Sequence, residues 1–186
     1  MLNHVYTSIN ADMSDLNAPA FTLRSFRLSD WPTIVENMNN PMVTRYLSSV
    51  PSPYGRSEAE SFIKMQIKED ESDHPSSFNK VITVNDEVIG SVGFRLNNSD
   101  STGLLGYWLA EKWWGRGIMT DAVKQITHIA FMKLGLSKIV ASTYFENTGS
   151  QNVLRKTGFK YVGDGTVRKW NGEEIPVHNF EFYYTN

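Results

Sequence analysis

The order of apolar and polar positions predicts a strand followed by a helix near the start of the chain. Residues 21–27 (FTLRSFR) alternate apolar and polar side chains, which is typical of a strand with one buried face. The sequence SDWP that follows (29–32) indicates a helix start, because proline is tolerated in the first turn of a helix. Residues 1–20 are polar with little periodicity, so we expect a loose N-terminal arm before the strand.

A second helix is predicted over residues 57–70 (SEAESFIKMQIKED). Ser57 and Glu60 have the spacing of a capping box, in which each side chain bonds a backbone N–H of the first turn. An apolar face is predicted from Phe62, Ile63, Met65 and Ile67.

Three neighbouring strands are predicted in the middle of the chain. Residues 78–84 and 87–95 flank Asn85 and Asp86, a pair that favours a tight hairpin turn. A polar stretch then leads to residues 104–110 (LLGYWLA), which have the composition of a third strand.

A strand, a helix and a parallel strand are predicted next. From Ile118 the apolar side chains keep helical spacing to about Leu134, and Gly135 stands where a helix C-cap belongs. Residues 138–145 (KIVASTYF) are rich in β-branched and aromatic side chains, as in a buried strand. Together with residues 104–110 they form a predicted βαβ unit, whose two strands run parallel.

The last part of the chain predicts a short helix and a hairpin. The helix falls within residues 146–159 and ends at Gly158, and Asn171-Gly172 marks the hairpin turn. A chain of 186 residues is long enough for one well-cored domain. We therefore expect a single domain over residues 21–186.

Two glycines stand directly before the central helix, in the sequence KWWGRGIMT (112–120). A glycine-rich turn that opens a helix brings unpaired backbone N–H groups and the positive end of the helix dipole together, which suits an anion. Gly115 and Gly117 lack a Cβ, so a phosphate can approach the main chain, and Arg116 and Thr120 could add a charge and a hydroxyl. The alternative is that the glycines only make a tight turn. The Rossmann fingerprint and the P-loop do not match this spacing.

Composition excludes several classes of function. With no cysteine, the chain cannot form disulfides, thiolate metal sites or a cysteine nucleophile, and its four histidines lack ligand spacing, so no metal is expected. The net charge of -2 does not indicate the basic surface that would bind nucleic acid or an anionic membrane. The N-terminus does not resemble a secretory signal, and no apolar run approaches the roughly 20 residues of a membrane helix. We expect a cytoplasmic enzyme or binding domain.

Two segments carry a family resemblance. Residues 105–123 (LGYWLAEKWWGRGIMTDAV) resemble motif A of the GCN5-related N-acetyltransferases (GNAT), and residues 146–159 (ENTGSQNVLRKTGF) resemble the segment that follows it there. The closer similarity is to the Rim-type branch, which acetylates N-terminal amines of ribosomal proteins and has many members with other substrates. The resemblance extends over residues 21–184. It implies a mixed α/β fold, in which a mostly antiparallel sheet is splayed between two parallel central strands and helices cover both faces.

The resemblance implies that acetyl-CoA is the acetyl donor. Its pantetheine arm is expected to bond the backbone near Trp108 and Leu109, like a short added strand. Lys112 stands where the family has Gln or Arg, which keeps a positive charge possible. The pyrophosphate is expected on the backbone amides of Gly115, Arg116, Gly117, Ile118, Met119 and Thr120.

Three polar residues after the second parallel strand have implied roles. In the resemblance Asn147 contacts the pantetheine arm, and Ser150 lies near the sulfur, where its hydroxyl could serve the departing thiolate. Taken alone, Asn147 and Ser150 could instead cap the short helix. Lys156 could reach a phosphate or be only a solvated helix residue.

The general base cannot be carried over from the family. Many relatives have a glutamate where this chain has Leu104. Candidates nearby are Tyr107, Glu111, Glu173 and Glu174, although Tyr107 could be a core aromatic and Glu111 a surface charge. A water chain to solvent is the alternative, with the protein supplying mainly proximity and orientation.

The sequence thus predicts an acetyl-CoA-dependent N-acetyltransferase that transfers an acetyl group to a primary amine, on a protein N-terminus or a small molecule. Leu104 leaves a non-catalytic acyl-CoA-binding domain as the alternative. A homodimer is expected only because dimers are common among proteins of this kind. For the acceptor pocket the places to look are Trp31, Tyr46, Tyr54 and the turn of residues 171–174; Trp113 and Trp114 shield the cofactor turn or divide between core and surface.

Overall fold

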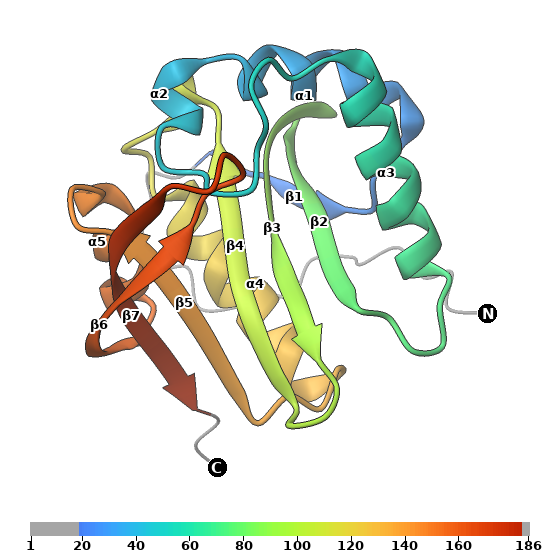
Figure 1. The fold of residues 1–186 in the computed structure, drawn as a ribbon. Helices are drawn as coiled ribbons and strands as arrows, with labels where there is room; N and C mark the ends of the chain where they lie inside the picture. The colour runs from blue at the N-terminus through green and yellow to red at the C-terminus, as the bar shows by residue number, and fades with distance from the viewer. Residues whose placement is uncertain (1–18, 184–186) are drawn as a thin grey trace.

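The computed structural model describes residues 19–183, which form one sheet with helices on both faces (Figure 1). The predicted arm over residues 1–20 lies almost entirely outside the described residues. Within them the sheet has the strand order β1-β2-β3-β4-β5-β7-β6. Its strands are β1 (Thr22–Arg24), β2 (Ser77–Val84), β3 (Glu87–Asn97), β4 (Thr102–Leu109), β5 (Lys138–Tyr144), β6 (Lys160–Arg168) and β7 (Glu174–Tyr183).

The four helices that the sequence predicts are present, and a short helix over Pro41–Thr44, which was not predicted, lies between the first two of them. Pro32 lies in the first turn of α1 (Trp31–Met38), and α4 (Ile118–Met132) ends two residues before the predicted end. Gly135 follows α4 with a φ of 65°, in the left-handed region, and the next N–H, that of Leu136, bonds the Ala130 carbonyl. The helices are η1 (Leu28–Asp30), α1 (Trp31–Met38), α2 (Pro41–Thr44), α3 (Arg56–Asp70), η2 (Glu111–Trp113), α4 (Ile118–Met132) and α5 (Thr148–Lys156).

The predicted capping box of Ser57 and Glu60 is wrong. Helix α3 begins one residue earlier, at Arg56, because Gly55 takes the N-cap position with an extended backbone. The Gly55 N–H donates to the carboxylate of Glu58 at 3.0 Å, so the first turn is capped from that side chain. Glu60 instead pairs with Arg56 at 2.6 Å on the helix surface.

Apolar side chains cover both faces of the sheet, and adjacent strand residues divide between them. Val81 packs with α1 and α3, whereas its neighbour Ile82 packs with α4 on the opposite face. Val88 and Ile89 divide in the same way, and all four side chains are buried. Because successive side chains of a strand point to opposite faces, this apolar run requires helices on both sides of the sheet.

One parallel pair lies between the two halves of the sheet. Strands β4 and β5 are in register only from Thr102 to Leu104 on one side and from Lys138 to Val140 on the other. Every other strand pair in the described part of the chain is antiparallel. Beyond these three pairs β4 and β5 separate, and we call this opening the β4–β5 gap. The predicted βαβ unit, its parallel strands and the splayed sheet are confirmed.

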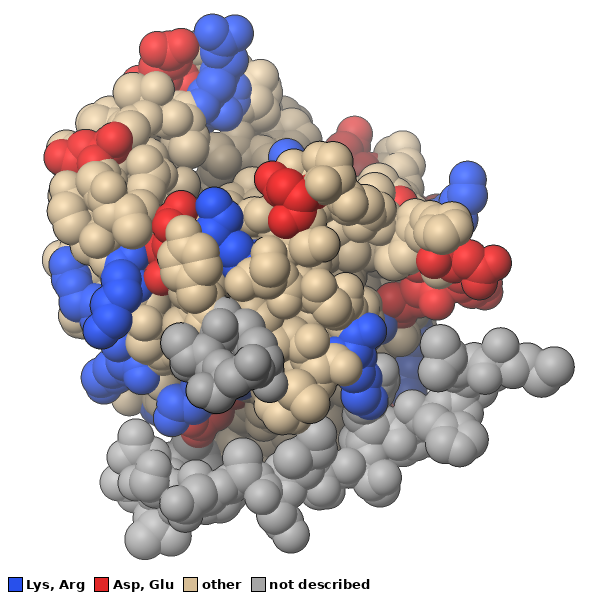
Figure 2. Space-filling view, turned by 90° about the horizontal axis from the view of Figure 1, so that it is seen from below, with Lys and Arg blue, Asp and Glu red and all other residues tan. Residues whose placement is uncertain are grey.

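The hairpin turns are also confirmed. Asn85 and Asp86 have φ values of 50° and 66°, as a tight turn between β2 and β3 requires, and Gly172 lies between β6 and β7 with a φ of 87°. Figure 2 shows acidic and basic side chains interspersed on the face seen from below, as the small net charge leads one to expect. No described helix has the length and hydropathy needed to cross a membrane.

Candidate functional site at the β4–β5 gap

The glycine turn lies at the end of β4, where η2 leads into α4. Gly115 has a φ of 74° and Gly117, the N-cap of α4, has a φ of 80°, so both positions need glycine. A Cβ on Gly115 would meet no atom within 4 Å. The first bond into the helix joins the Asp121 N–H to the Gly117 carbonyl, and no side chain caps the helix among the described residues. The amides that precede Asp121 in this turn donate to no backbone carbonyl of the described residues, and such unpaired N–H groups at a helix start suit a phosphate.

The two tryptophans before this turn have different roles. Trp113 packs against the α4 side of the core, and the Arg116 guanidinium lies 4.9 Å from the centre of its ring. Trp114 is 41% exposed, and its indole Nε1–H donates to the Leu109 carbonyl at 2.7 Å. This bond joins the glycine turn to the edge of β4, where a pantetheine arm is expected. One tryptophan therefore belongs to the core and the other is partly exposed.

Lys112 and Glu111 lie on the α1 side of this turn. The Lys112 ammonium pairs with Glu87 at 2.7 Å, and both side chains are more than half exposed, so the pair contributes little to stability. Glu111 accepts a hydrogen bond from the Asn40 amide at 3.1 Å. Both line a pocket of about 440 Å³, which also contains Glu36, and which we call the α1 pocket.

Two predicted catalytic residues meet across the β4–β5 gap. The Tyr107 Oη of β4 lies 2.8 Å from the Ser150 Oγ of α5, and it also donates to the Ser150 carbonyl at 3.3 Å. Burial raises the pKa of Tyr107 to about 12, although the hydrogen bond with Ser150 acts in the opposite direction. The phenol is therefore protonated at physiological pH, where Tyr107 can donate a hydrogen bond.

The first turn of α5 also holds Asn147. Its side-chain oxygen accepts the Ser150 N–H at 3.0 Å, so Asn147 is the N-cap of the helix. Ser150 does not cap, because its hydroxyl is paired with Tyr107. The Asn147 cap thereby fixes the backbone that carries Ser150. Lys156 is exposed in the last turn of α5, roughly 9 Å along the helix from Ser150.

Aromatic and charged residues from other segments gather around Tyr144, the last residue of β5. The rings of Tyr46 and Tyr144 meet edge to face at 5.8 Å, and the Lys169 ammonium lies 5.8 Å from the centre of the Tyr144 ring. Lys169 also pairs with Glu173 at 3.2 Å. Burial and, to a lesser extent, the charge of Glu173 raise the pKa of Tyr144. The Tyr144 hydroxyl is buried and has no hydrogen-bond partner in the part of the chain that the structure describes.

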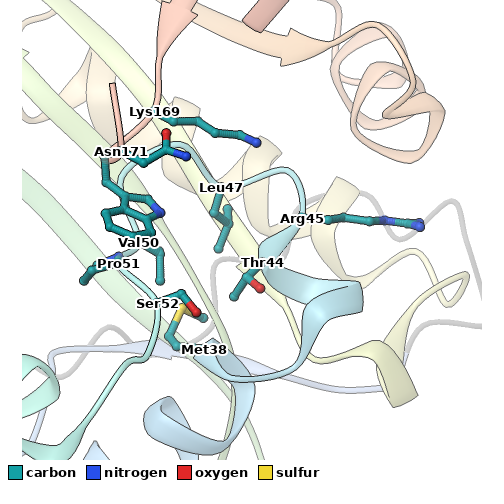
Figure 3. Close-up of a pocket in the computed structure, with 10 residues that line it drawn as sticks. Met38, Thr44, Arg45, Leu47, Val50, Pro51, Ser52, Lys169 and Asn171 are labelled. Atoms are coloured by element: carbon teal, nitrogen blue, oxygen red, sulfur yellow. The ribbon is translucent and has the colours of Figure 1, made fainter. Parts of the chain in front are cut away.

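A pocket of about 180 Å³ opens beside these residues, between the segment 44–52 and the β6–β7 turn. We call it the hairpin pocket. A backbone bond of 2.8 Å from the Trp170 N–H to the Ser48 carbonyl joins its two sides. In Figure 3 the side chains of Arg45 and Lys169 extend toward the same side of the pocket, one from each wall. Its apolar lining consists of Met38, Leu47, Val50 and Pro51.

The expected acceptor residues divide between this region and the core. Tyr46 and the turn of residues 171–174 lie at or beside the hairpin pocket. Trp31 and Tyr54 instead pack with α3 in the core on the α1 side of the sheet. Glu174 pairs with Arg168 on an exposed surface.

Three residues at this end of the molecule carry no signal in the sequence. Arg45 and Lys169 belong to no motif, and Tyr144 reads as an ordinary strand aromatic. The loop between Thr44 and Tyr54 and the β6–β7 turn bring them together. Leu104, where many relatives have a glutamate, is paired in register with Val140 and offers no proton acceptor.

The sequence was compared with families of known proteins. Residues 20–160 match the family model described as an acetyltransferase (GNAT) domain. The chain therefore belongs to the GNAT acetyltransferase family, and its class is that of the acyltransferases that act as N-acetyltransferases. A relative from Bacillus licheniformis, described as "Uncharacterized N-acetyltransferase p20", is 29% identical over 172 residues, which cover 90% of this chain and 95% of that protein.

Solved structures share the fold. Mycobacterium smegmatis RimJ, in complex with CoA-disulfide, superposes with a TM-score of 0.78 at 20% identity, covering 90% of this chain and 83% of that one. Spermidine N-acetyltransferase from Vibrio cholerae, in complex with CoA and spermine, superposes with a TM-score of 0.74 at 20% identity, covering 88% and 95%. The GNAT fold predicted from the sequence is confirmed.

Proposed function

We propose that this protein transfers the acetyl group of acetyl-CoA to a primary amine by direct attack within a ternary complex. The observation that carries the proposal is the β4–β5 gap, which has the glycine turn at one end and the Tyr107–Ser150 pair across it. We further propose that residues 21–186 form one N-acetyltransferase domain of the Rim-type branch and that the protein is located in the cytoplasm. The similarity to RimJ supports the branch at the level of the fold.

The residues present fit acetyl-CoA. The open space beside Gly115 and the unbonded amides before Asp121 suit a pyrophosphate, with Arg116 and Thr120 beside them. Beyond Leu104 the edge of β4 is free of β5, so a pantetheine arm can bond the backbone near Trp108 and Leu109. The Leu109 carbonyl already accepts one bond from Trp114, and its second lone pair is available.

The protein contributes hydrogen-bond donors to the reaction and holds the reacting groups in position. Bound acetyl-CoA supplies an activated acyl group as a thioester. Either hydroxyl can be the donor in the 2.8 Å contact between Tyr107 and Ser150. In the proposed reaction the Tyr107 proton is directed to Ser150 Oγ instead of to the Ser150 carbonyl, so the Ser150 hydroxyl proton can bond the departing sulfur. Asn147 holds the Ser150 backbone in place through its cap. The acceptor enters from the side of Tyr46 and Tyr144.

We assign deprotonation of the amine to solvent. Tyr107 is protonated, because burial raises its pKa to about 12, and Glu111 lines the α1 pocket, where it is bonded to Asn40. The pH dependence of kcat/KM should therefore follow the pKa of the amine acceptor. It should move when the acceptor is replaced by an amine of different basicity.

Thermal unfolding in the presence of ligands tests the proposal. A ligand at about 100 times its dissociation constant stabilises the folded state by roughly 2.7 kcal/mol. Acetyl-CoA and CoA should raise the melting temperature, whereas NAD and ATP should not, and CoA release with a panel of amines should then show turnover. Absence of a shift with acetyl-CoA and CoA, or a shift with NAD or ATP instead, would contradict the proposal.

A further inference from the structure

We propose that the hairpin pocket binds a carboxylate carried by the acceptor, so that the preferred acceptors are amines with a carboxylate a few bonds from the nitrogen. The inference rests on the proposed function and adds the chemical class of the acceptor. Its basis is the charge of the two pockets beside the β4–β5 gap. Arg45 and Lys169 line the hairpin pocket, and no Asp or Glu does so among the described residues. The α1 pocket has the opposite character, with Glu36, Glu87 and Glu111 around Lys112.

The charge of Arg45 is available to a ligand. Its guanidinium lies 4.6 Å from the centre of the Tyr46 ring and forms no ion pair with a carboxylate of the described residues. A cation held over an aromatic face keeps its charge and its N–H donors free at the edge. Lys169 is less available, because Glu173 neutralises part of its charge at 3.2 Å. Arg45 is therefore the residue that decides the charge of the pocket.

The size of the pocket limits the group it can take. About 180 Å³ corresponds to the share of roughly six water molecules in the liquid, so the pocket suits a compact group about the size of one amino-acid residue. Met38, Leu47, Val50 and Pro51 make much of its lining apolar. A carboxylate bonded at Arg45 would lie beside this lining, and because Arg45 is exposed, the ion pair would have the modest strength of a surface pair.

The hairpin pocket is connected to the transfer site through residues that touch one another. Lys169 lies over the ring of Tyr144, the last residue of β5, and the Tyr46 hydroxyl bonds the Glu146 carbonyl at 3.3 Å. The chain then enters α5, where Ser150 meets Tyr107 across the gap. An acceptor anchored at Arg45 can thus extend its amine toward the gap. A polyamine, in contrast, would bring its positive charges against Arg45 and Lys169.

Two matched pairs of acceptors test the inference and separate the two sources of the carboxylate. The first pair is a free amino acid and its carboxamide. The second is a tripeptide with Asp at its second position and the same peptide with Asn, and spermidine is a cationic comparison. We expect kcat/KM to be about fivefold or more higher for the acid in at least one pair, the effect of one partly exposed ion pair. The pair that shows the preference identifies the source.

Variants then assign the preference to Arg45. Arg45→Gln should reduce the preference for the acid to less than about twofold, and Arg45→Glu should reverse it, with the affinity for acetyl-CoA unchanged in both. Arg56→Gln is the matched control, because Arg56 also lies 4.6 Å from the centre of an aromatic ring, that of Trp31, but does not line the hairpin pocket. It should keep the preference of the parent protein.

The outcomes separate this inference from the proposed function. Equal kcat/KM for acid and amide in both pairs, faster turnover with spermidine, or an unchanged preference in Arg45→Gln would overturn the inference alone. Absence of turnover with every amine in the parent protein would contradict the proposed function, and the inference would fall with it.

Discussion

The two sides of the β4–β5 gap are built from different parts of the chain. On the side proposed for the cofactor the candidate binding groups are backbone amides, whose positions follow from the φ angles of Gly115 and Gly117 and from the start of α4. On the acceptor side the groups are side chains, Arg45 and Lys169, which extend from a loop and a hairpin turn. A backbone site depends on a few glycines, whereas a side-chain site can change with any residue of its loops. The comparison predicts that donor recognition and acceptor choice can be changed separately in this protein.

The largest effect is expected from a charge placed in the backbone site. Gly117→Glu puts a carboxylate where the pyrophosphate is proposed, and like charges about 4 Å apart near a protein surface repel by roughly 4 kcal/mol. We expect the affinity for acetyl-CoA, measured by titration calorimetry, to fall more than about 100-fold.

Gly135→Glu is the matched control for this substitution. Gly135 also has a positive φ, and no atom lies within 4 Å of an added Cβ, but it follows the other end of α4. It imposes similar backbone strain and should keep acetyl-CoA binding. Equal losses in the two variants would show that strain, and not the anion site, is responsible.

The buried phenol of Tyr107, which meets Ser150 across the β4–β5 gap, predicts a pH dependence of stability. A group whose pKa is raised in the folded state stabilises the fold below its unfolded pKa, and this contribution is lost as pH rises through the folded value. For Tyr107 the window runs from pH 10 to about 12, and up to about 2.7 kcal/mol of unfolding free energy should be lost across it. In Tyr107→Phe this part of the decrease should be absent, as urea unfolding at several pH values will show. An equal decrease of the unfolding free energy in Tyr107→Phe would contradict the claim that burial raises the pKa of Tyr107.

Ser150→Ala tests whether the cofactor side also holds the chemistry. The variant loses the hydroxyl proposed to bond the departing sulfur, so kcat should fall about 10- to 100-fold, while the affinity for acetyl-CoA stays within about twofold. Ser137→Ala removes a serine hydroxyl just before β5, at the other end of the strand, and should leave both quantities unchanged. A Ser150→Ala variant as fast as the parent protein would remove Ser150 from the reaction.

The smallest effect is expected on the acceptor side, from Tyr144→Phe. The Tyr144 hydroxyl is buried without a partner, and an unsatisfied buried hydroxyl destabilises a fold, so its removal should raise the unfolding free energy by about 1 kcal/mol. Tyr161→Phe is the control, because the Tyr161 hydroxyl bonds Asp164 at 2.9 Å, and its removal should give no gain. Loss of stability in Tyr144→Phe would show that the hydroxyl has a partner in solution.

The difference between a site made of backbone groups and a site made of side chains also explains what the sequence could predict. The glycine turn, α4 and the β4–β5 pair follow from local patterns, because positive φ angles and apolar periodicity leave their marks in neighbouring residues. The contact of Tyr107 with Ser150 was not predicted, although both residues were expected at the site. The two residues are 43 positions apart in the chain, and only the fold brings them within hydrogen-bond distance.

The acceptor side was predicted only in outline. The first helices and the terminal hairpin were expected to form it, and Tyr46 and the turn of residues 171–174 do lie there. Trp31 was expected there but is partly buried against the core on the α1 side of the sheet. The capping box at Ser57 fails because Gly55 and Glu58 make a cap that begins two residues earlier.

The short register between β4 and β5 has a consequence for local opening of the sheet. Strands β1 to β4 pair only with one another and with β5, while β5, β7 and β6 form a second group that is contiguous in the chain. Three residue pairs join the two groups. A junction of so few pairs can open without unfolding either group, so we expect its amide protons to exchange with solvent faster than those of the β2–β3 and β6–β7 pairs, which have eight residue pairs each.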